Sequence, residues 1–221
     1  MQVRGAPKLK VCCIGSPEEA RLAIQYGASA IGLVSAMPSG PGVISDDVIA
    51  EIASEVPPGV TSVLLTSRQD ADAIVEQQRR SRVQAIQICD TLATADYDRL
   101  RRALPGIGVI QVIHITGPEA LNDACRVAPH VSALLLDSGN PALSVKELGG
   151  TGRVHDWTLS RRIREAVVAP VFLAGGLHSG NVRAAVQHVG PYAVDVCSGL
   201  RRDGALSERL LSDFVRQLWA A

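Results

Sequence analysis

Short apolar runs recur along the whole chain, and segments with helical patterning separate them. Several runs are almost entirely apolar rather than alternating, which is typical of parallel strands that are covered on both faces. A strand followed by a helix, repeated in this way, predicts an α/β protein with a parallel sheet. The runs are Val11–Ile14, Ala30–Val34, Val60–Leu65, Ala85–Ile88, Gly108–Ile115, Ala133–Leu136, Val171–Leu173 and Ala193–Val196.

The segments between the runs carry helix start and stop signals. Ser16 can accept the free amides of a first turn, Pro17 suits the first helical position, and Gly27 marks the end of that helix. Ser45 opens a second apolar-periodic stretch, which Pro57 ends. These signals support the assignment of helices between the strands.

Eight such units in 221 residues predict a single (β/α)₈ TIM barrel, with residues 1–221 as one domain. An open doubly wound sheet is the alternative, because the order of elements does not show whether the last strand pairs with the first. The loops 35–45 and 138–157 follow strands and are rich in Gly, Pro and Ser. Loops at that end of such barrels carry function, and the loop 35–45 is a candidate lid.

Composition excludes several classes of protein. Lys+Arg and Asp+Glu both number 22, so neither nucleic acid nor an anionic membrane is an expected partner. The five cysteines show no paired CxxC spacing, which argues against a disulfide framework or a zinc site and favours a reducing cytoplasm. The first residues lack the apolar core of a signal peptide, and every apolar run is shorter than the roughly 20 residues that a membrane span needs.

Three glycine-bearing segments follow late strands, at 149–152, 174–177 and 195–199. Glycine lets backbone amides approach a phosphate closely, and in barrels of this kind the phosphate commonly sits in the loops after strands seven and eight. Segment 179–182 is expected to cap a helix whose amides face the same pocket. The candidate phosphate-binding residues are Gly150, Thr151, Gly152, Gly175, Gly176, Ser198 and Gly199.

A thiol and a carboxyl group follow the first and sixth predicted strands. Alternation along the first strand turns Lys10 and Cys12 to one face and Cys13 to the other, so Cys12 is the candidate that points inward. A thiolate can abstract a carbon-bound proton, and Asp137 can donate one if an apolar wall raises its pKa. A buried core cysteine and a carboxyl that only braces its loop are the structural alternatives.

The order of these motifs resembles that of the phosphoribosylanthranilate isomerase family, from Lys10 to Gly199. Lys10-Val11-Cys12 is similar to the family's K-[IV]-C-G, Ile86-Gln87 to its V-Q-L-H-G, and Leu136-Asp137 to its L-L-D. The later segments match more closely: Gly149-Gly150-Thr151-Gly152 with Asp156-Trp157, Leu173-Ala174-Gly175-Gly176-Leu177, and Pro191-Tyr192-Ala193-Val194-Asp195-Val196-Cys197-Ser198-Gly199.

The resemblance implies an Amadori rearrangement of a small phosphorylated amino sugar without a metal or an organic cofactor. Cys12 would be the general base and Asp137 the general acid. Gln87 and Asp195 would contact the substrate. A monomer or a homodimer is expected.

Three departures from the family lie where the family handles anthranilate. Cys13 replaces the glycine after the catalytic cysteine, and Cys89 replaces the histidine of V-Q-L-H-G. The segment 39–42 lacks the arginine that the resemblance assigns to the anthranilate carboxylate, and no basic residue lies between Arg21 and Arg68. The phosphate end matches the family.

Other functions therefore stay open at this stage. The chain is a phosphoribosylanthranilate isomerase, a paralogue that acts on a phosphorylated amino sugar with another aglycone, or a non-catalytic barrel that binds a phosphosugar. An epimerase or a synthase on the same fold is a further alternative. His114 and His155 are candidate ligand contacts, although a core histidine and a solvated loop histidine are commoner, and their spacing supports no metal site.

Overall fold

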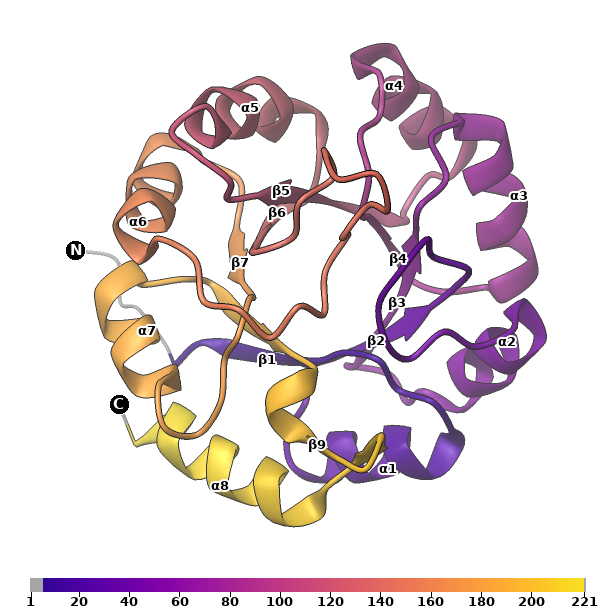
Figure 1. Cartoon of the computed structure of the whole chain (residues 1–221). Helices are drawn as coiled ribbons and strands as arrows, with labels where there is room; N and C mark the ends of the chain where they lie inside the picture. Colours follow the sequence, from indigo (N-terminus) through magenta and orange to yellow (C-terminus); the bar gives the residue numbers. More distant parts are fainter. Residues whose placement is uncertain (1–5, 221) are drawn as a thin grey trace.

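The computed structural model describes residues 6–220, in which eight parallel strands form a closed barrel (Figure 1). Each strand pairs with the next along the chain, and the last pairs with the first, with Lys8 opposite Ala193 and Val11 opposite Val196. The predicted barrel is confirmed and the open sheet is excluded. The strands are β1 (Lys8–Val11), β2 (Ala30–Val34), β3 (Thr61–Thr66), β4 (Ala85–Ile88), β5 (Gly108–His114), β6 (Ala133–Asp137), β7 (Val171–Leu173) and β8 (Ala193–Val196).

A ring of α-helices surrounds the barrel (Figure 1). Ser16 and Ser45 cap the first two, accepting from the amides of Glu19 and Val48 at 3.3 Å, as their sequences predict. None of the helices within residues 6–220 is long and apolar enough to cross a bilayer. They are α1 (Pro17–Gln25), α2 (Asp46–Glu55), α3 (Ala71–Ser81), α4 (Thr94–Ala103), α5 (Ala120–Val127), α6 (Trp157–Ala166), α7 (Val182–Val189) and α8 (Glu208–Trp219).

Short elements complete the fold. The 3₁₀ turns η1 (Ala128–His130) and η2 (Ser198–Leu200) follow α5 and β8, and a small hairpin of β9 (Arg201–Arg202) and β10 (Ala205–Leu206) precedes α8.

The first strand lies earlier than its apolar run predicts. The run suggests Val11–Ile14, but the strand ends at Val11. Cys12 still donates its amide to Val196 O at 2.9 Å, and Cys13 then turns the chain with a left-handed φ of 62°. Cys12 to Ile14 are buried beyond the strand, and this burial explains why the run continues there.

Alternation along the strands builds two apolar layers. Leu9, Leu64 and Leu134 face the helices, whereas Val34 and Leu135 belong to a second cluster inside the barrel. The interior also holds buried polar side chains at alternate strand positions close to the carboxyl ends: Lys10, Gln87, Asp137 and Asp195. The chemistry of the protein is therefore built into the inner face of the sheet.

The two long loops after strands touch each other. In Figure 1 the loop after β6 crosses above the centre of the ring, near the loop after β2. Ser39 Oγ donates to Lys146 O at 2.6 Å, and a Cβ on Gly150 would lie 2.6 Å from Pro41 Cδ. These contacts join both loops over the mouth of the barrel.

Glu19 on α1 fastens the β9–β10 hairpin to the barrel. Its carboxylate accepts from Arg201 at 2.9 and 3.1 Å, from Leu206 N at 2.8 Å and from Gly15 N at 2.9 Å. Burial opposes the charged form, but the bonds from Arg201 and from the two amides outweigh it and lower the pKa of Glu19.

We expect Glu19→Gln to lower the free energy of unfolding at pH 7 by about 1–3 kcal/mol, because charge-assisted bonds to Arg201 are lost. Because the pKa of Glu19 is lowered in the folded state, its carboxylate contributes fully to stability above the ordinary glutamate pKa. This contribution is lost as the pH falls through the pKa of Glu19 in the folded state. Urea unfolding from pH 7 down to pH 3 should therefore show the two proteins converging.

The matched control is Glu18→Gln on the same helix. Glu18 is exposed, and its ion pair within residues 6–220 is with the exposed Arg21, so its replacement should leave stability nearly unchanged. Equal effects of the two substitutions would contradict the role given to Glu19.

Candidate active site

A pocket of about 660 Å³ opens at the carboxyl ends of the strands. Loops after β1, β2, β6, β7 and β8 contribute to it, as do side chains of β3 and β4. It brings together nearly all of the residues that the sequence suggests. Among those lining it are Cys12, Gln87, Asp137, Gly150, Thr151, Gly152, Gly175, Gly176, Asp195 and Ser198. Gly199 follows directly after Ser198 but does not line the pocket itself.

A buried ion pair lies beneath the pocket. Lys10 on β1 is fully buried, and its ammonium lies 2.9 Å from Asp195 Oδ1 on β8. Burial disfavours the charge of Lys10, but Asp195 and then Cys12 outweigh it and raise the pKa of Lys10 above its usual value. Lys10 is therefore a fixed cation at the floor of the site.

Cys12 lies beside this cation. The position that a Cβ on Gly32 would occupy is 2.8 Å from Cys12 Sγ and 3.1 Å from Lys10 Nζ. Only glycine on β2 leaves room for both side chains. The Cys12 thiol and the Lys10 ammonium are therefore neighbours on the inner face of the barrel.

Cys13 corrects the expectation that only one of the adjacent thiols points inward. Both Cys12 and Cys13 line the pocket, because the left-handed turn at Cys13 interrupts the strand alternation on which that expectation rests. Arg201 donates to the carbonyl of Cys13 and holds this turn. Contact of Cys13 with the thiols of Cys12 and Cys197, together with burial, raises the pKa of Cys13. The Cys13 thiol therefore stays neutral.

Asp137 ends β6 on the opposite side of the pocket. Burial raises its pKa, and Asp195 adds to this effect, while the Ser138 amide, which donates to Asp137 Oδ1 at 2.7 Å, opposes it. A Cβ on Gly149 would lie 2.8 Å from Asp137 Oδ2, so the backbone of the loop after β6 covers the carboxyl group. A carboxyl group in this setting can hold a proton and donate it.

The three glycine segments meet at one end of the pocket. A Cβ on Gly176 would lie 2.7–2.8 Å from backbone atoms of residues 152–154, and one on Gly152 would lie 3.7 Å from Ser198 Oγ. Gly152, Gly175 and Gly176 have positive φ angles that favour glycine. Gly199 is equally constrained, because its Cβ would lie 2.0 Å from Leu177 O. The backbones of the three segments therefore pack closely together, and glycine lets backbone amides of such loops approach a phosphate.

The side chains of Thr151 and Asn181 make contacts that the sequence does not predict. The Thr151 hydroxyl already lies 2.7 Å from Ser138 Oγ. Asn181 does not cap α7 with its side chain; its amide group donates to Gly176 O at 2.9 Å and its Oδ1 accepts from His178 N at 2.9 Å. Asn181 therefore shapes the loop after β7, because the turn that precedes α7 directs its side chain back to that loop.

Gln87 has a free acceptor in the pocket. Its side chain is buried, and Oε1 has no hydrogen-bond partner among residues 6–220. An unpaired buried carbonyl oxygen is costly, so a donor on a bound ligand is a favourable partner.

The two candidate histidines, His114 and His155, do not line the pocket and have structural contacts. His114 Nε2 lies 2.9 Å from Cys89 O, and His155 Nε2 lies 2.8 Å from Ser160 Oγ. Burial lowers the pKa of His155 to about 4, with Asp156 acting in the opposite direction, so His155 is neutral near pH 7. In the described part of the chain no group of three His, Cys, Asp or Glu residues is arranged to hold a metal ion.

The pocket also has an apolar end. Val34, Met37, Leu65 and Leu148 line it, and they offer surface to a flat hydrophobic group. No lysine or arginine is among the pocket-lining residues that the structure describes.

A sequence model of N-(5'-phosphoribosyl)anthranilate isomerases matches residues 9–217. The chain belongs to this family. N-(5'-phosphoribosyl)anthranilate isomerase 2 of Methanosarcina mazei is 35% identical over 95% of this chain and 93% of its own length. The isomerase of Haloferax volcanii is 34% identical over 97% of this chain and 92% of its own length.

Solved structures of the family share the fold. The phosphoribosylanthranilate isomerase of Thermotoga maritima has a TM-score of 0.83 and 25% identity, over 97% of this chain and all of that chain. Another phosphoribosylanthranilate isomerase, solved in complex with reduced 1-(o-carboxyphenylamino)-1-deoxyribulose 5-phosphate, has a TM-score of 0.81 and 24% identity over the same shares.

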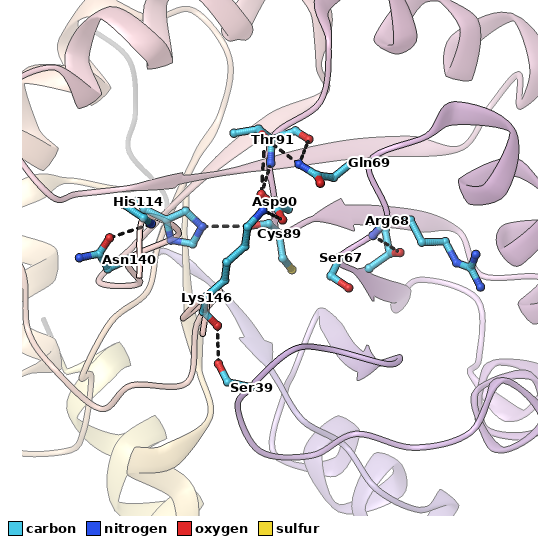
Figure 2. A network of polar contacts seen from close by, with 12 residues as sticks. Ser39, Ser67, Arg68, Gln69, Cys89, Asp90, Thr91, His114, Asn140 and Lys146 are labelled. Atoms are coloured by element: carbon cyan, nitrogen blue, oxygen red, sulfur yellow. Dashed lines mark hydrogen bonds and ion pairs between the residues drawn. The ribbon is translucent and has the colours of Figure 1, made fainter. Parts of the chain in front are cut away.

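Two of the departures from the family motifs, Cys89 and the segment 39–42, border a polar network at the carboxyl end of β4 (Figure 2). Asp90 accepts from the Lys146 ammonium at 2.6 Å and from Thr91 N at 2.7 Å. Gln111 donates to Asp90 O at 2.9 Å. Burial raises the pKa of Cys89, the residue before Asp90, to about 12, so its thiol is neutral.

Sequence reasoning placed Lys10 on the inward face of β1 but gave it no role in the site, and it missed Asp90 and Lys146. The signal for Lys10 is a cation on the inward face of an otherwise apolar strand, opposite Asp195 in the register of β1 with β8. No local signal links Lys146 to Asp90, because 56 positions separate them.

We expect Lys10→Met to lower the free energy of unfolding by about 3–5 kcal/mol, because the buried Asp195 carboxylate is left without its cation. The double variant Lys10→Met with Asp195→Leu should recover most of this loss. Guanidinium unfolding of the three proteins at pH 7 measures both effects. If the free energy of unfolding of Lys10→Met lies within about 1 kcal/mol of that of the parent, the ion pair contributes little to stability.

Proposed function

We propose that this protein is a phosphoribosylanthranilate isomerase, which converts N-(5'-phosphoribosyl)anthranilate into the 1-deoxyribulose phosphate ketose. The observation that carries the proposal is one pocket in which a thiol beside a fixed cation faces a carboxyl group of raised pKa, next to crowded glycine loops. Family membership and the names of the relatives support an aldose–ketose isomerase. The alternative of a non-catalytic barrel is not favoured.

The proposed chemistry is general acid–base catalysis by two groups. Asp137 donates a proton to the furanose ring oxygen, and the C1′–O bond breaks as the anilino nitrogen forms a Schiff base with C1′. Cys12, as a thiolate, removes the proton from C2′, and the electron pair forms the enolamine. A proton added at C1′ and one lost from the C2′ hydroxyl then give the ketose.

The rest of the pocket supports binding of such a substrate. The phosphate would lie against the amides of Gly150, Gly152, Gly175, Gly176 and Gly199, with the Ser198 and Thr151 hydroxyls nearby. Gln87 and Asp195 would contact the sugar, and the apolar end would hold the aromatic ring. We further propose that the chain is one domain, that it is a monomer or a homodimer, and that it works in the cytoplasm on a small phosphorylated sugar.

Replacement of either proposed catalytic group should abolish most of the turnover. Each of Cys12→Ser and Asp137→Asn should lower kcat by about 10²–10⁴-fold, because a positioned acid or base contributes that much. Loss of anthranilate fluorescence from freshly prepared phosphoribosylanthranilate reports the reaction.

The control is Cys125→Ser, which changes an exposed cysteine outside the pocket and should retain full activity. Turnover that survives the loss of Cys12 would contradict the assignment of the base. Turnover absent from the parent protein would contradict the function.

The raised pKa of Asp137 predicts the direction of the pH dependence. Asp137 must be protonated to donate, so kcat should fall as pH rises through its pKa, which lies above the ordinary value of about 3.9. Measurement of kcat from pH 5 to pH 10 should show this alkaline loss. A rate that stays level to pH 10 would exclude Asp137 as the acid.

A further inference from the structure

The proposed substrate carries two anions, but only one end of the pocket is built for an anion. The glycine loops suit the phosphate, whereas the apolar end presents no cation from its lining residues within the described chain. A carboxylate that enters an apolar cleft without a partner pays a desolvation cost of several kcal/mol. On the proposed function, the aglycone carboxylate therefore needs a cation from outside the pocket lining.

Lys146 is the cation at the rim of the apolar end. Its backbone carbonyl accepts from Ser39, which lines the pocket, and Leu148, two residues further on, lines it as well. Its ammonium reaches Asp90, the residue after the pocket-lining Cys89. Figure 2 shows the Lys146 side chain running from the Ser39 contact to Asp90.

Lys146 has unused hydrogen-bonding capacity. An ammonium group has three donors, and the contact found for Nζ in the described structure is the one with Asp90 at 2.6 Å. The Asp90 side chain is only 5% exposed, whereas that of Lys146 is 37% exposed. Asp90 is thus the fixed partner, and the flexible lysine stem can turn its remaining donors toward the pocket.

Three other basic residues near the mouth of the barrel lack either the position or the free donors of Lys146. Lys10 is fully buried against Asp195. Arg153 pairs with Glu147 and approaches Ser138 O, on the side of the glycine loops. Arg68 is exposed, and Figure 2 shows its guanidinium pointing away from Asp90 and Lys146.

We propose that Lys146 is the specificity-determining residue that binds the aglycone carboxylate, with Asp90 holding its ammonium at the pocket rim. Lys146 has no part in the proton transfers. Its charge selects an acidic aromatic aglycone over a neutral one and thereby takes the place of a basic residue in the loop after β2.

Binding of two matched probes tests this assignment without turnover. One is reduced 1-(o-carboxyphenylamino)-1-deoxyribulose 5-phosphate, and the other is the same molecule without the carboxyl group. The parent protein should bind the first about 10- to 100-fold more tightly, as expected for a charge-assisted contact. In Lys146→Met, which keeps the stem, this preference should disappear while binding of the neutral probe stays unchanged.

Two further variants separate charge from structure. Lys146→Arg should retain the preference, and Arg68→Met should leave it intact. Equal weakening of both probes in Lys146→Met, or an unchanged preference, would overturn the proposal. If both probes bind as predicted but no isomerisation occurs, the proposed function is wrong and the role of Lys146 stands. If the parent protein binds both probes equally well, the role of Lys146 is wrong.

Discussion

The ion pair between Lys10 and Asp195 is the interaction on which the site depends. It lies at the seam where β1 meets β8, and the two residues are also opposite each other in the strand register. Cys12 follows two residues after Lys10, and the Ser198 turn follows three residues after Asp195. One buried contact therefore spans the strand pair that closes the barrel, and it places a cation beside the proposed base and near the phosphate end.

Glycine and one strained cysteine shape the space above this pair. Gly32 leaves room for Cys12 and Lys10, while Gly149 brings backbone onto Asp137. Cys13 occupies a left-handed conformation that costs a non-glycine residue about 1–2 kcal/mol. Arg201, which Glu19 holds in place, donates to the Cys13 carbonyl. The rim is thus supported from the outer hairpin as well as from the strands.

Periodicity and motif order were enough to predict the barrel and most of the pocket. Runs such as Ala30–Val34 and Val171–Leu173 coincide with β2 and β7, because each is bounded by loop residues. The run at Val11 misplaced β1, since buried residues continue into the turn at Cys13. Local sequence patterns do not predict the contacts of Asn181 and Lys146. The Asn181 side chain bonds back to the loop that precedes it, and the Lys146 carbonyl accepts from Ser39, which is 107 positions away.

The central claim is that one pocket holds the sugar between Cys12 and Asp137 with its phosphate on the glycine loops. A crystal structure with the reduced carboxyphenylamino deoxyribulose phosphate tests it most directly. The account predicts phosphate oxygens on amides of segments 150–152, 175–176 and 198–199, with the sugar carbons between the thiol and the carboxyl group. A phosphate bound elsewhere, or a sugar that contacts neither group, would contradict it.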